Sequence, residues 1–586
     1  MRLIISLVLA LAFSSAAYAF SPGAKSVQPP DARFEALYGR EWAWRQAQFG
    51  GNEANDQFVP DHLPHEDPAT HAARLAYWRQ VKGELDALGV SALSPANQVN
   101  FAVYRAQIET LIADERFRTW EAPLNSDSQF WADLAGASRR SFKTANQYRA
   151  YIGQLNDMPR YFREQIANMN LGLKRGFSVP RVTLNGRDQS IADVVSETQP
   201  ESNVFWYPLD HMPSSIPAAE QAALKADAAR AISEAVIPAH RELLAFMRST
   251  YLPNTRTTLA AEAMPDGKAY YRSQIREYTT LDMDPDAIHA LGLKEVDRIH
   301  REMLETVTAT GFKGDFPAFL EFLRTDPRFY AKTPQELLDR AAGIAKAGDG
   351  KIPTWFGHPP RGRFDIRPVP DQIAPFYTSG RGGAHTYWLN TYDLPHRPLY
   401  NLTALTLHEA EFGHSYQLSL SEELTDLPAF RRESYLSAYG EGWALYVEKL
   451  GKEMGMYATP YDEFGRETYE MWRACRLVVD TGIHHLGWSR QQAIDYLAAN
   501  TALPHHEIET EVDRYISWPA QALSYKLGEL DILRNRDRAQ AALGPRFDIR
   551  SFHDTVLSLG SVPLPVLDSR IDRFIAEGGK GPWAIH

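Results

Sequence analysis

The sequence predicts a mainly α fold in which two lobes enclose a deep cleft, with one small β-sheet. Apolar residues recur at three-to-four spacing through most of the 586-residue chain, which is typical of amphipathic helices. Strand-like segments are few and short. No internal repeat, low-complexity tract or Ser/Gly linker divides the chain after residue 31, and 44% hydrophobic residues can form a large core. We therefore predict a single domain over 32–586, with an N-terminal lobe of about 32–260 and a second lobe of about 261–586.

The chain opens with the pattern of a secretory signal peptide. In MRLIISLVLALAFSSAAYAF, Arg2 supplies a positive start, residues 3–13 are apolar, and Ala17 and Ala19 flank a small-x-small cleavage site. The apolar run is too short for a membrane span, which needs roughly 20 residues, and no later segment approaches that length. We predict a signal peptide at 1–19, a linker at 20–31, and an exported protein that is periplasmic or secreted and not inserted in a membrane.

The charge and the cysteine content exclude some classes of binding partner and of metal site. The net charge of −11 is spread along the chain, which argues against a nucleic-acid surface and against a basic membrane anchor. Cys475 is the one cysteine, so no intramolecular disulfide can form and a cysteine-rich metal site is excluded.

Helices are predicted along most of the chain and strands at three places. Helical periodicity is clear over 67–88, 146–169 and 333–347, the last beginning with Thr333 and Glu336 as a capping box. Further helices are predicted over 399–412, 439–450 and much of the last hundred residues. Short β-rich segments bounded by Gly or Pro predict strands near 269–280, 362–370 and 384–394.

The segment LHEAEFGHSYQ at 407–417 raises the question of a metal site. In the motif HExxH, two histidines one helical turn apart bind zinc and the glutamate activates water. Here His408 and His414 are six positions apart. In a straight helix, six residues leave the second imidazole roughly 120° around the axis and about 9 Å further along. The two rings can meet only if the helix bulges or breaks, and Gly413 is the residue that permits this.

A second predicted helix supplies a third ligand. YGEGWALYVEKL at 439–450 carries Glu441 near its start, 27 residues after His414. We predict one Zn²⁺ bound by His408, His414 and Glu441, with an open position for water and Glu409 as the general base. The alternative is a chance His-Glu pair, with Glu441 as an ordinary partner of a helix N-terminus.

The order of motifs resembles a known family. HEAEFGHSYQ, EGWALYVE, DTGIHHLGWSRQQA and the segment beginning RYISWPAQALSYKLGELDI resemble, in order, signature blocks of the bacterial domain-of-unknown-function family 885. That family resembles helical zinc metallopeptidases such as thimet oligopeptidase, the Taq-type carboxypeptidases and angiotensin-converting enzyme. The resemblance covers nearly all of the chain after the signal peptide and implies a metallopeptidase-like fold.

The family pattern HEAxPGHxxQ can be compared with this chain position by position. The residues that match are His408, Glu409, Gly413, His414 and Gln417. Phe412 stands where the pattern has proline, so Gly413 alone must break the helix. In the related peptidases a glutamate on a following helix completes the zinc site, and the resemblance matches Glu441 to it.

Other residues are candidates for catalysis and substrate binding. An oxyanion donor is predicted among Tyr515, Tyr525 and the pair His484 and His485, each of which could instead be a buried or loop residue. The strand RGGAHTYWLNTYD at 381–393 is predicted to contact a peptide, or else to lie inside the sheet. Gly382 and Gly383 would permit close backbone approach, and Tyr387 and Asn390 would offer side-chain contacts. Two further candidates for substrate binding are Arg514 and Gln521. Arg514 either binds a substrate carboxylate or is solvated.

These observations predict a zinc-dependent hydrolase of peptides or oligopeptides. Two alternatives remain open. The first is an amidase or isopeptidase that acts on a non-standard amide. The second is a non-catalytic peptide-binding scaffold of the same fold, which Glu409 disfavours because a binding protein needs no base beside the ligands.

The signal-peptide hypothesis gives a first testable prediction. Cleavage is expected after Ala19, so that the mature protein begins at Phe20, because the apolar segment and the small residues suit a signal peptidase. N-terminal sequencing of exported material measures this. An intact Met1 on protein that stays in the cytoplasm would refute both the cleavage site and the export.

Overall fold

The computed structural model describes residues 29–51, 58–371 and 374–583. The predicted signal peptide and most of the predicted linker lie outside these residues. The first helix, α1, begins at Pro30, close to the predicted start of the folded body.

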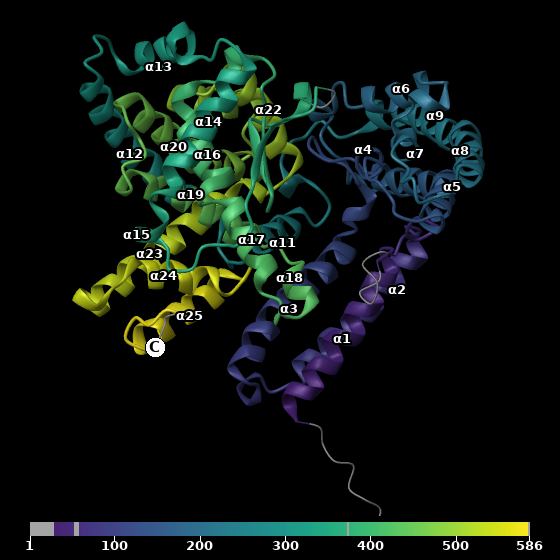
Figure 1. Ribbon diagram of the computed structural model, residues 1–586, viewed down its shortest axis with the longest axis horizontal. Helices are drawn as coiled ribbons and strands as arrows, with labels where there is room; N and C mark the ends of the chain where they lie inside the picture. The colour runs from purple at the N-terminus through teal and green to yellow at the C-terminus, as the bar shows by residue number, and fades with distance from the viewer. Residues whose placement is uncertain (1–28, 52–57, 372–373, 584–586) are drawn as a thin grey trace, which may run out of the picture.

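The protein is mainly helical with one small sheet, as predicted (Figure 1). The N-terminal helices α1 to α3 form a long arm, and α4 to α9 gather in a separate body beside the larger C-terminal body. In the N-terminal half the helices are α1 (Pro30–Gln48), α2 (Pro68–Asp86), α3 (Pro95–Phe117), α4 (Phe130–Ala137), α5 (Ala145–Arg175), α6 (Gln189–Ser196), α7 (Tyr207–Asp210), α8 (Ala218–Ala231), α9 (Ile237–Phe246) and α10 (Leu252–Asn254).

The C-terminal body contains the remaining helices and the sheet. Before the sheet lie α11 (Gly267–Thr279), α12 (Pro285–Thr310), α13 (Phe316–Thr325), α14 (Pro334–Asp349) and α15 (Ile352–Trp355). After it lie α16 (Leu402–Thr406), α17 (His414–Glu423), α18 (Ala429–Arg432), α19 (Ser437–Glu453), α20 (Pro460–His484), α21 (Arg490–Asn500), α22 (His505–Ser517), α23 (Ser524–Leu543), α24 (Ile549–Leu557) and α25 (Leu564–Ala576).

The sheet has three strands in the order β1-β3-β2. The strands are β1 (Asp365–Pro368), β2 (Gly380–Gly382) and β3 (Thr386–Leu389). β1 pairs parallel with β3, and β2 pairs antiparallel with it. β1 and β3 confirm the strands predicted at 362–370 and 384–394. β2 is therefore an edge strand of this sheet.

The strand predicted at 269–280 is wrong, because that segment is helix α11. Its aromatic and β-branched residues suggested a strand, but the buried positions Tyr270, Tyr271, Gln274 and Ile275 recur at three-to-four spacing. This spacing puts them on one face of a helix, and tertiary packing of that face outweighs the intrinsic β-preference.

Predicted helix starts are found with their caps. The Thr333 hydroxyl accepts the Glu336 N–H, as the capping-box pattern predicts. The Glu336 carboxylate, however, reaches the Lys332 N–H rather than that of Thr333. At α21 the box is complete, because Ser489 and Gln492 satisfy each other's backbone groups.

The hydrophobic cores show how the bodies are joined. Residues of α4 to α9 form a core of their own, which includes Trp131, Leu155 and Leu243. The arm formed by α1 to α3 instead shares a core with the C-terminal body, where Tyr104 packs against Phe430 at a ring distance of 5.1 Å. The arm thus ties the small body to the large one.

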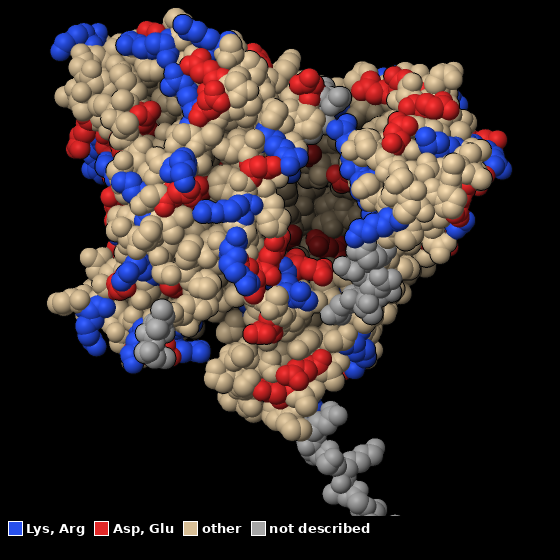
Figure 2. All heavy atoms as spheres, in the orientation of Figure 1, with Lys and Arg blue, Asp and Glu red and all other residues tan. Residues whose placement is uncertain are grey.

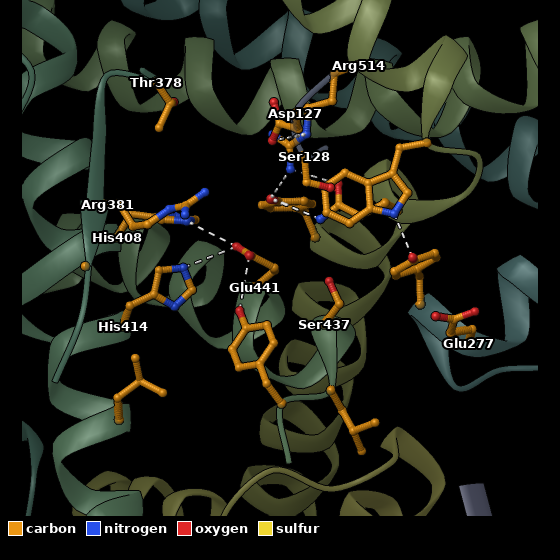
Figure 3. Close-up of a pocket in the computed structure, with 18 of the residues that line it drawn as sticks. Asp127, Ser128, Glu277, Thr378, Arg381, His408, His414, Ser437, Glu441 and Arg514 are labelled. Atoms are coloured by element: carbon orange, nitrogen blue, oxygen red, sulfur yellow. Dashed lines mark hydrogen bonds and ion pairs between the residues drawn. The ribbon is translucent and has the colours of Figure 1, made fainter. Parts of the chain in front are cut away.

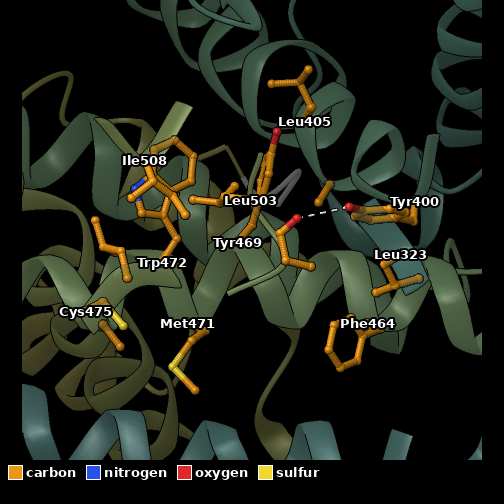
Figure 4. Packing of buried hydrophobic residues seen from close by; sticks show 14 of the residues in the cluster. Leu323, Tyr400, Leu405, Phe464, Tyr469, Met471, Trp472, Cys475, Leu503 and Ile508 are labelled. Atoms are coloured by element: carbon orange, nitrogen blue, oxygen red, sulfur yellow. Dashed lines mark hydrogen bonds between the residues drawn. The ribbon is translucent and has the colours of Figure 1, made fainter. Parts of the chain in front are cut away.

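Helix α20 is the buried axis of the C-terminal body. Residues 464–484 of this helix are all buried. Figure 4 shows Phe464, Met471 and Cys475 on one side of the helix, with Tyr469 and Trp472 on another. Trp472 also lines a large cavity, so α20 joins the core to that cavity. No helix in the described part of the chain combines the length and apolar character of a membrane span.

Helices α19 and α23 cross with their backbones in contact. A Cβ on Gly442 of α19 would lie 2.5 Å from the Gly528 Cα, and one on Gly528 would lie 1.9 Å from the Ala438 carbonyl oxygen. Only glycine permits so close an approach. The crossing brings the start of α19 beside the start of α23.

This crossing predicts a large effect of Gly528→Ala. The added methyl group has no space, so we expect the variant to lose about 1–3 kcal/mol of stability and to melt at a lower temperature. Gly343→Ala is the matched control, because Gly343 lies on the exposed face of α14 with nothing near its missing Cβ. That control should match or exceed the wild-type melting temperature. A Gly528→Ala protein as stable as wild type would contradict the close crossing.

Candidate metal centre

The helix that carries the motif changes its winding at the metal site. α16 ends at Thr406 and continues as a π-helical turn over Leu407–Glu411. Gly413 is not helical, and α17 begins at His414. The two imidazole rings then lie 4.9 Å apart and nearly perpendicular, although they are six residues apart in sequence. The predicted bulge or break before His414 is confirmed.

Gly413 is required by a close approach of the backbone to itself. A Cβ at this position would lie 1.8 Å from the His408 carbonyl oxygen and 2.6 Å from that of Leu407. The chain folds back over the preceding turn, and this brings His414 toward His408. A side chain at position 413 would prevent that reversal.

Phe412, which replaces the family's proline, is fixed by packing instead. Its ring is fully buried and stacks on Phe356 at 5.2 Å. Its carbonyl oxygen accepts the Trp443 indole N–H at 2.7 Å. Trp443 belongs to α19, the helix that carries Glu441. The break in one helix is therefore tied directly to the other.

His408, His414 and Glu441 converge on one point (Figure 3). The Nε2 atoms of His408 and His414 lie 3.4 Å and 3.3 Å from the same Oε2 atom of Glu441. Tetrahedral zinc with ligands at about 2.0–2.1 Å would hold neighbouring ligand atoms roughly 3.3 Å apart. Among the described residues, none donates a hydrogen bond to this buried Oε2 atom. The donor set and its spacing fit a zinc ion.

The next layer of residues orients the ligands. His408 Nδ1 donates to Glu448 Oε1 at 2.6 Å, which directs Nε2 to the site. Burial disfavours a charged imidazole, but the nearby carboxylates of Glu441 and Glu448 outweigh it and raise the pKa of His408 to about 9. Burial likewise opposes ionisation of Glu441, yet the two imidazoles hold its pKa well below the usual range. The Glu441 carboxylate is thus ionised and ready to bind a cation.

Glu409 lies beside the ligands and is held by the sheet. Its Oε2 atom accepts the Gly382 N–H at 2.7 Å. A Cβ on Gly382 would lie 1.7 Å from the Glu409 carbonyl oxygen, so the edge strand β2 packs directly on the π-helical turn. The carboxylate is thereby fixed at the wall of the cavity.

These residues line a cavity of about 910 Å³. Figure 2 shows it as a hollow between the bodies, with acidic and basic side chains at its rim and floor. Of the predicted site residues, the structure brings seven into its wall: His408, Glu409, His414, Glu441, Arg514, Gln521 and Tyr525.

Tyr525, Arg514 and Gln521 form a group on the wall opposite His414. The Tyr525 ring stacks 6.4 Å from the His408 ring. Its hydroxyl lies 3.3 Å from Arg514 Nη2, which also donates to the Gln521 side chain at 3.0 Å. Of the two candidate tyrosines, Tyr525 is the one at the metal centre.

Tyr515 and the two histidines lie outside the cavity wall. The Tyr515 hydroxyl accepts hydrogen bonds from Trp472 and Arg476 at 2.7 Å and 2.9 Å. His484 Nε2 donates to the Tyr515 carbonyl oxygen at 2.8 Å, and burial lowers the pKa of His484 to about 3. His485 pairs with Glu262. The prediction of Tyr515 and His484 as catalytic groups is not supported, because packing already uses their polar atoms.

Tyr387 and Asn390 are also absent from the cavity wall. β3 is the central strand, so Tyr387 is fully buried between its neighbours. The Asn390 amide donates to the Ala374 and Tyr377 carbonyl oxygens and is fully buried. Of the segment predicted to contact a peptide, the part that lines the cavity is Arg381 and Gly382 of the edge strand β2, and not Tyr387 or Asn390.

Sequence reasoning missed several residues of the site. Glu448 lies seven residues after Glu441, a spacing that puts both on one face of α19, and this signal could have been found. Tyr435 donates to Glu441 Oε1 at 3.1 Å from a loop that has no distinctive pattern. Arg381, Arg473 and Arg476 line the cavity too. Arginines on amphipathic helices are ordinarily solvated, so the burial of Arg473 and Arg476 on α20 was not predictable.

The fold and site define a large helical protein with a two-His, one-Glu centre in a deep cavity. Residues 45–571 match the family described as "Bacterial protein of unknown function (DUF885)", and the chain belongs to this family. No curated protein matches the chain. The chain is also similar to two solved structures.

One solved structure is that of a predicted lipoprotein from Colwellia psychrerythraea. It is 26% identical, with a TM-score of 0.84 over 93% of this chain and 98% of that one. The other is that of a predicted lipoprotein of unknown function from Shewanella oneidensis. It is 18% identical, with a TM-score of 0.68 over 93% and 99% of the two chains. The whole described architecture is thus shared.

The ligand geometry predicts how metal content responds to substitution. His414→Ala should abolish binding of one Zn²⁺ per chain, and Glu448→Gln should weaken it by about 10- to 100-fold, since Glu448 only orients His408. Metal titration followed by elemental analysis measures both. His484→Gln is the control, a buried histidine outside the cavity, and should keep its zinc. A tightly bound zinc in His414→Ala would contradict the proposed ligands.

Proposed function

We propose that this protein is an exported, zinc-dependent peptide hydrolase in which Glu409 is the general base. One observation carries the proposal. Beside the three converging ligands, a second carboxylate, that of Glu409, faces the cavity and is held there by a backbone N–H of an edge strand. A site that only binds metal for structure has no use for such a group.

Zinc would be held by His408, His414 and Glu441. When bound there, zinc would polarise a carbonyl group and lower the pKa of water, as in other zinc hydrolases. The set of two imidazoles and one carboxylate leaves a coordination position free, which is typical of catalytic rather than structural sites. The fit of the 3.3–3.4 Å spacing to a tetrahedral ion supports zinc.

Glu409 would move the protons of the reaction. It accepts a proton from the attacking water and delivers it to the departing amine, as glutamates in zinc peptidases do. The Gly382 N–H fixes one carboxylate oxygen and leaves the other for the proton. Because the carboxylate is already fixed in position, the reaction does not bear the entropic cost of ordering it.

The cavity supports a peptide as the substrate. A volume of about 910 Å³ accommodates several residues, and the edge strand β2 can pair with an extended chain. Tyr525, at the metal centre, would donate a hydrogen bond to the oxyanion through its hydroxyl. Arg514 lies 3.3 Å from that hydroxyl and would orient it.

Export is the second part of the proposal. The first 19 residues have the pattern of a signal peptide, and both similar solved structures are described as predicted lipoproteins. Lipoproteins are exported proteins, so the two observations agree.

The variant Glu409→Gln tests the base directly. The amide keeps the shape of the side chain but cannot accept the proton, so kcat on a peptide library should fall by about 10² or more while zinc content and melting temperature stay near wild type. Cleavage is followed by mass spectrometry and metal by elemental analysis.

Glu411→Gln is the matched control two residues away. Burial and the nearby Asp349 raise the pKa of Glu411 to about 8, so this group is mostly protonated at neutral pH and an amide mimics it. It does not line the cavity, and kcat should change by less than about twofold. Full turnover by Glu409→Gln would overturn the role of Glu409, and absence of any zinc-dependent cleavage by wild type would overturn the proposed function.

A further inference from the structure

Two arginines of the buried helix α20 form part of the cavity wall. Arg473 and Arg476 are one turn apart and have side chains only 5% and 2% exposed. The guanidinium carbons of both lie over the Trp472 ring, at 4.2 Å and 4.4 Å. The Tyr525 ring also lies beneath both, at 5.9 Å and 4.2 Å. Aromatic rings thus fix the two cations at the edge of the cavity.

The hydrogen-bonding groups of these arginines are not fully used. Within the described residues, Arg473 Nε and Arg476 Nη1 are buried with no hydrogen-bond partner. The Nη groups of Arg473 make only long contacts, at 3.4 Å to the Tyr469 carbonyl oxygen and at 3.7 Å to Glu448. Leaving donors of a buried cation unpaired is costly, and such groups are normally satisfied.

Another buried arginine of the same helix shows a contrast. Arg466, seven residues before Arg473 on α20, pairs with Glu470 at 2.6 Å and with Glu463 at 2.8 Å. It does not line the cavity. The incomplete pairing of Arg473 is therefore not a general property of the buried arginines of this helix.

The neighbouring carboxylates do not neutralise Arg473. Glu448 is bound to His408. Glu511 pairs with Arg476 at 2.8 Å and lies 3.5 Å from Arg514. Burial raises the pKa of Glu507 to about 7, so its charge is only partly present at neutral pH. Asp127 also lies 3.9 Å from Arg514. Of Arg473, Arg476 and Arg514, Arg473 is the one that has no carboxylate of the described residues closer than 3.7 Å.

Arg473 and Arg476 lie close to the candidate metal centre. Tyr525 stacks at 6.4 Å on His408 and at 4.2 Å under the Arg476 guanidinium, so one ring separates the metal ligand from the cation. An extended chain advances by roughly 3.5 Å per residue. A carboxylate one or two residues beyond the bond at the metal would reach the arginines.

We infer that Arg473 and Arg476 form a subsite for a carboxylate of the substrate, supplied by the free C-terminus of a peptide or by an acidic side chain. The inference rests on the proposed function and deepens it. Arginine binds carboxylates through paired N–H groups, and the interaction is strong where water is excluded. A free C-terminus in this position would select cleavage within one or two residues of the end of the chain.

The wild-type protein tests the inference without any substitution. Peptides of one sequence are compared with a free C-terminal carboxylate and with a C-terminal carboxamide, and kcat/KM is measured for each. The free acid should be preferred by about tenfold or more. A third peptide carries a carboxamide end and Glu in place of Gln near the end. A preference for this peptide over its Gln form identifies the side chain as the source, and equal rates for all peptides overturn the subsite.

Substitutions assign the effect to the arginines. Arg473→Gln and Arg476→Gln should each reduce the ratio of kcat/KM for acid over amide toward one, and Arg473→Lys should retain part of it because the charge remains. Arg466→Lys is the control on the same helix and should leave the ratio unchanged. A ratio that survives in both glutamine variants would overturn the assignment to these two residues.

Binding separates this inference from the proposed function. Calorimetric titration of the Glu409→Gln protein with acid and amide peptides requires no turnover. Tighter binding of the acid peptide by about tenfold supports the subsite. If wild type nevertheless cleaves neither peptide, the proposed hydrolysis is refuted and the subsite is not. Equal affinity for both peptides would overturn the subsite even if wild type proves to be a zinc peptidase.

Discussion

The candidate metal centre depends on one backbone contact, the return of the chain over the His408 carbonyl at Gly413. Two histidines one turn apart meet on any regular helix. Histidines six residues apart, as here, meet only with an added π turn and a reversal of the chain. The reversal is held from outside, because the Phe412 ring is locked in the core and its carbonyl is bound by Trp443. Since Trp443 and Glu441 share α19, the same contact sets the third ligand.

A second close approach between backbones positions the part of the cavity wall that carries Tyr525. Gly442, next to Glu441, touches Gly528, and the start of α23 therefore brings Tyr525 to the cavity beside His408. The positions of the candidate ligands, Glu409 and Tyr525 thus depend on places where glycine lets backbones touch. These are Gly382 of β2 against Glu409, Gly413 at the reversal, and Gly442 against Gly528 at the helix crossing. Rigid elements in direct contact hold a site more accurately than side chains that pack loosely.

The general architecture was predictable because helical periodicity dominates the sequence. The failure at 269–280 arose where aromatic residues favour a strand locally while their spacing suits a helix. The convergence of His408, His414 and Glu441 was predictable because the sequence shows which residue types occur and where a helix must break. The wall was harder to predict. Tyr515 and Tyr525 look alike in sequence, and only the packing of α20 and α22 shows that one hydroxyl is used by Trp472 and Arg476.

The burial of charged groups in the cavity supports a chemical function more strongly than the shared fold does. A shared fold leaves function open, and the similar structures show the fold. A buried charge without a partner, however, lowers stability by several kcal/mol in the absence of a compensating group. In this cavity two buried charged groups are incompletely paired. Glu441 Oε2 lies 3.3–3.4 Å from two imidazoles and, among the described residues, Arg473 Nε has no hydrogen-bond partner. Under the proposed function a cation would pair with the first group, and in the inferred subsite a carboxylate would pair with the second. Because one tyrosine ring separates the two groups, one short peptide could then place its scissile carbonyl at the first and its carboxylate at the second.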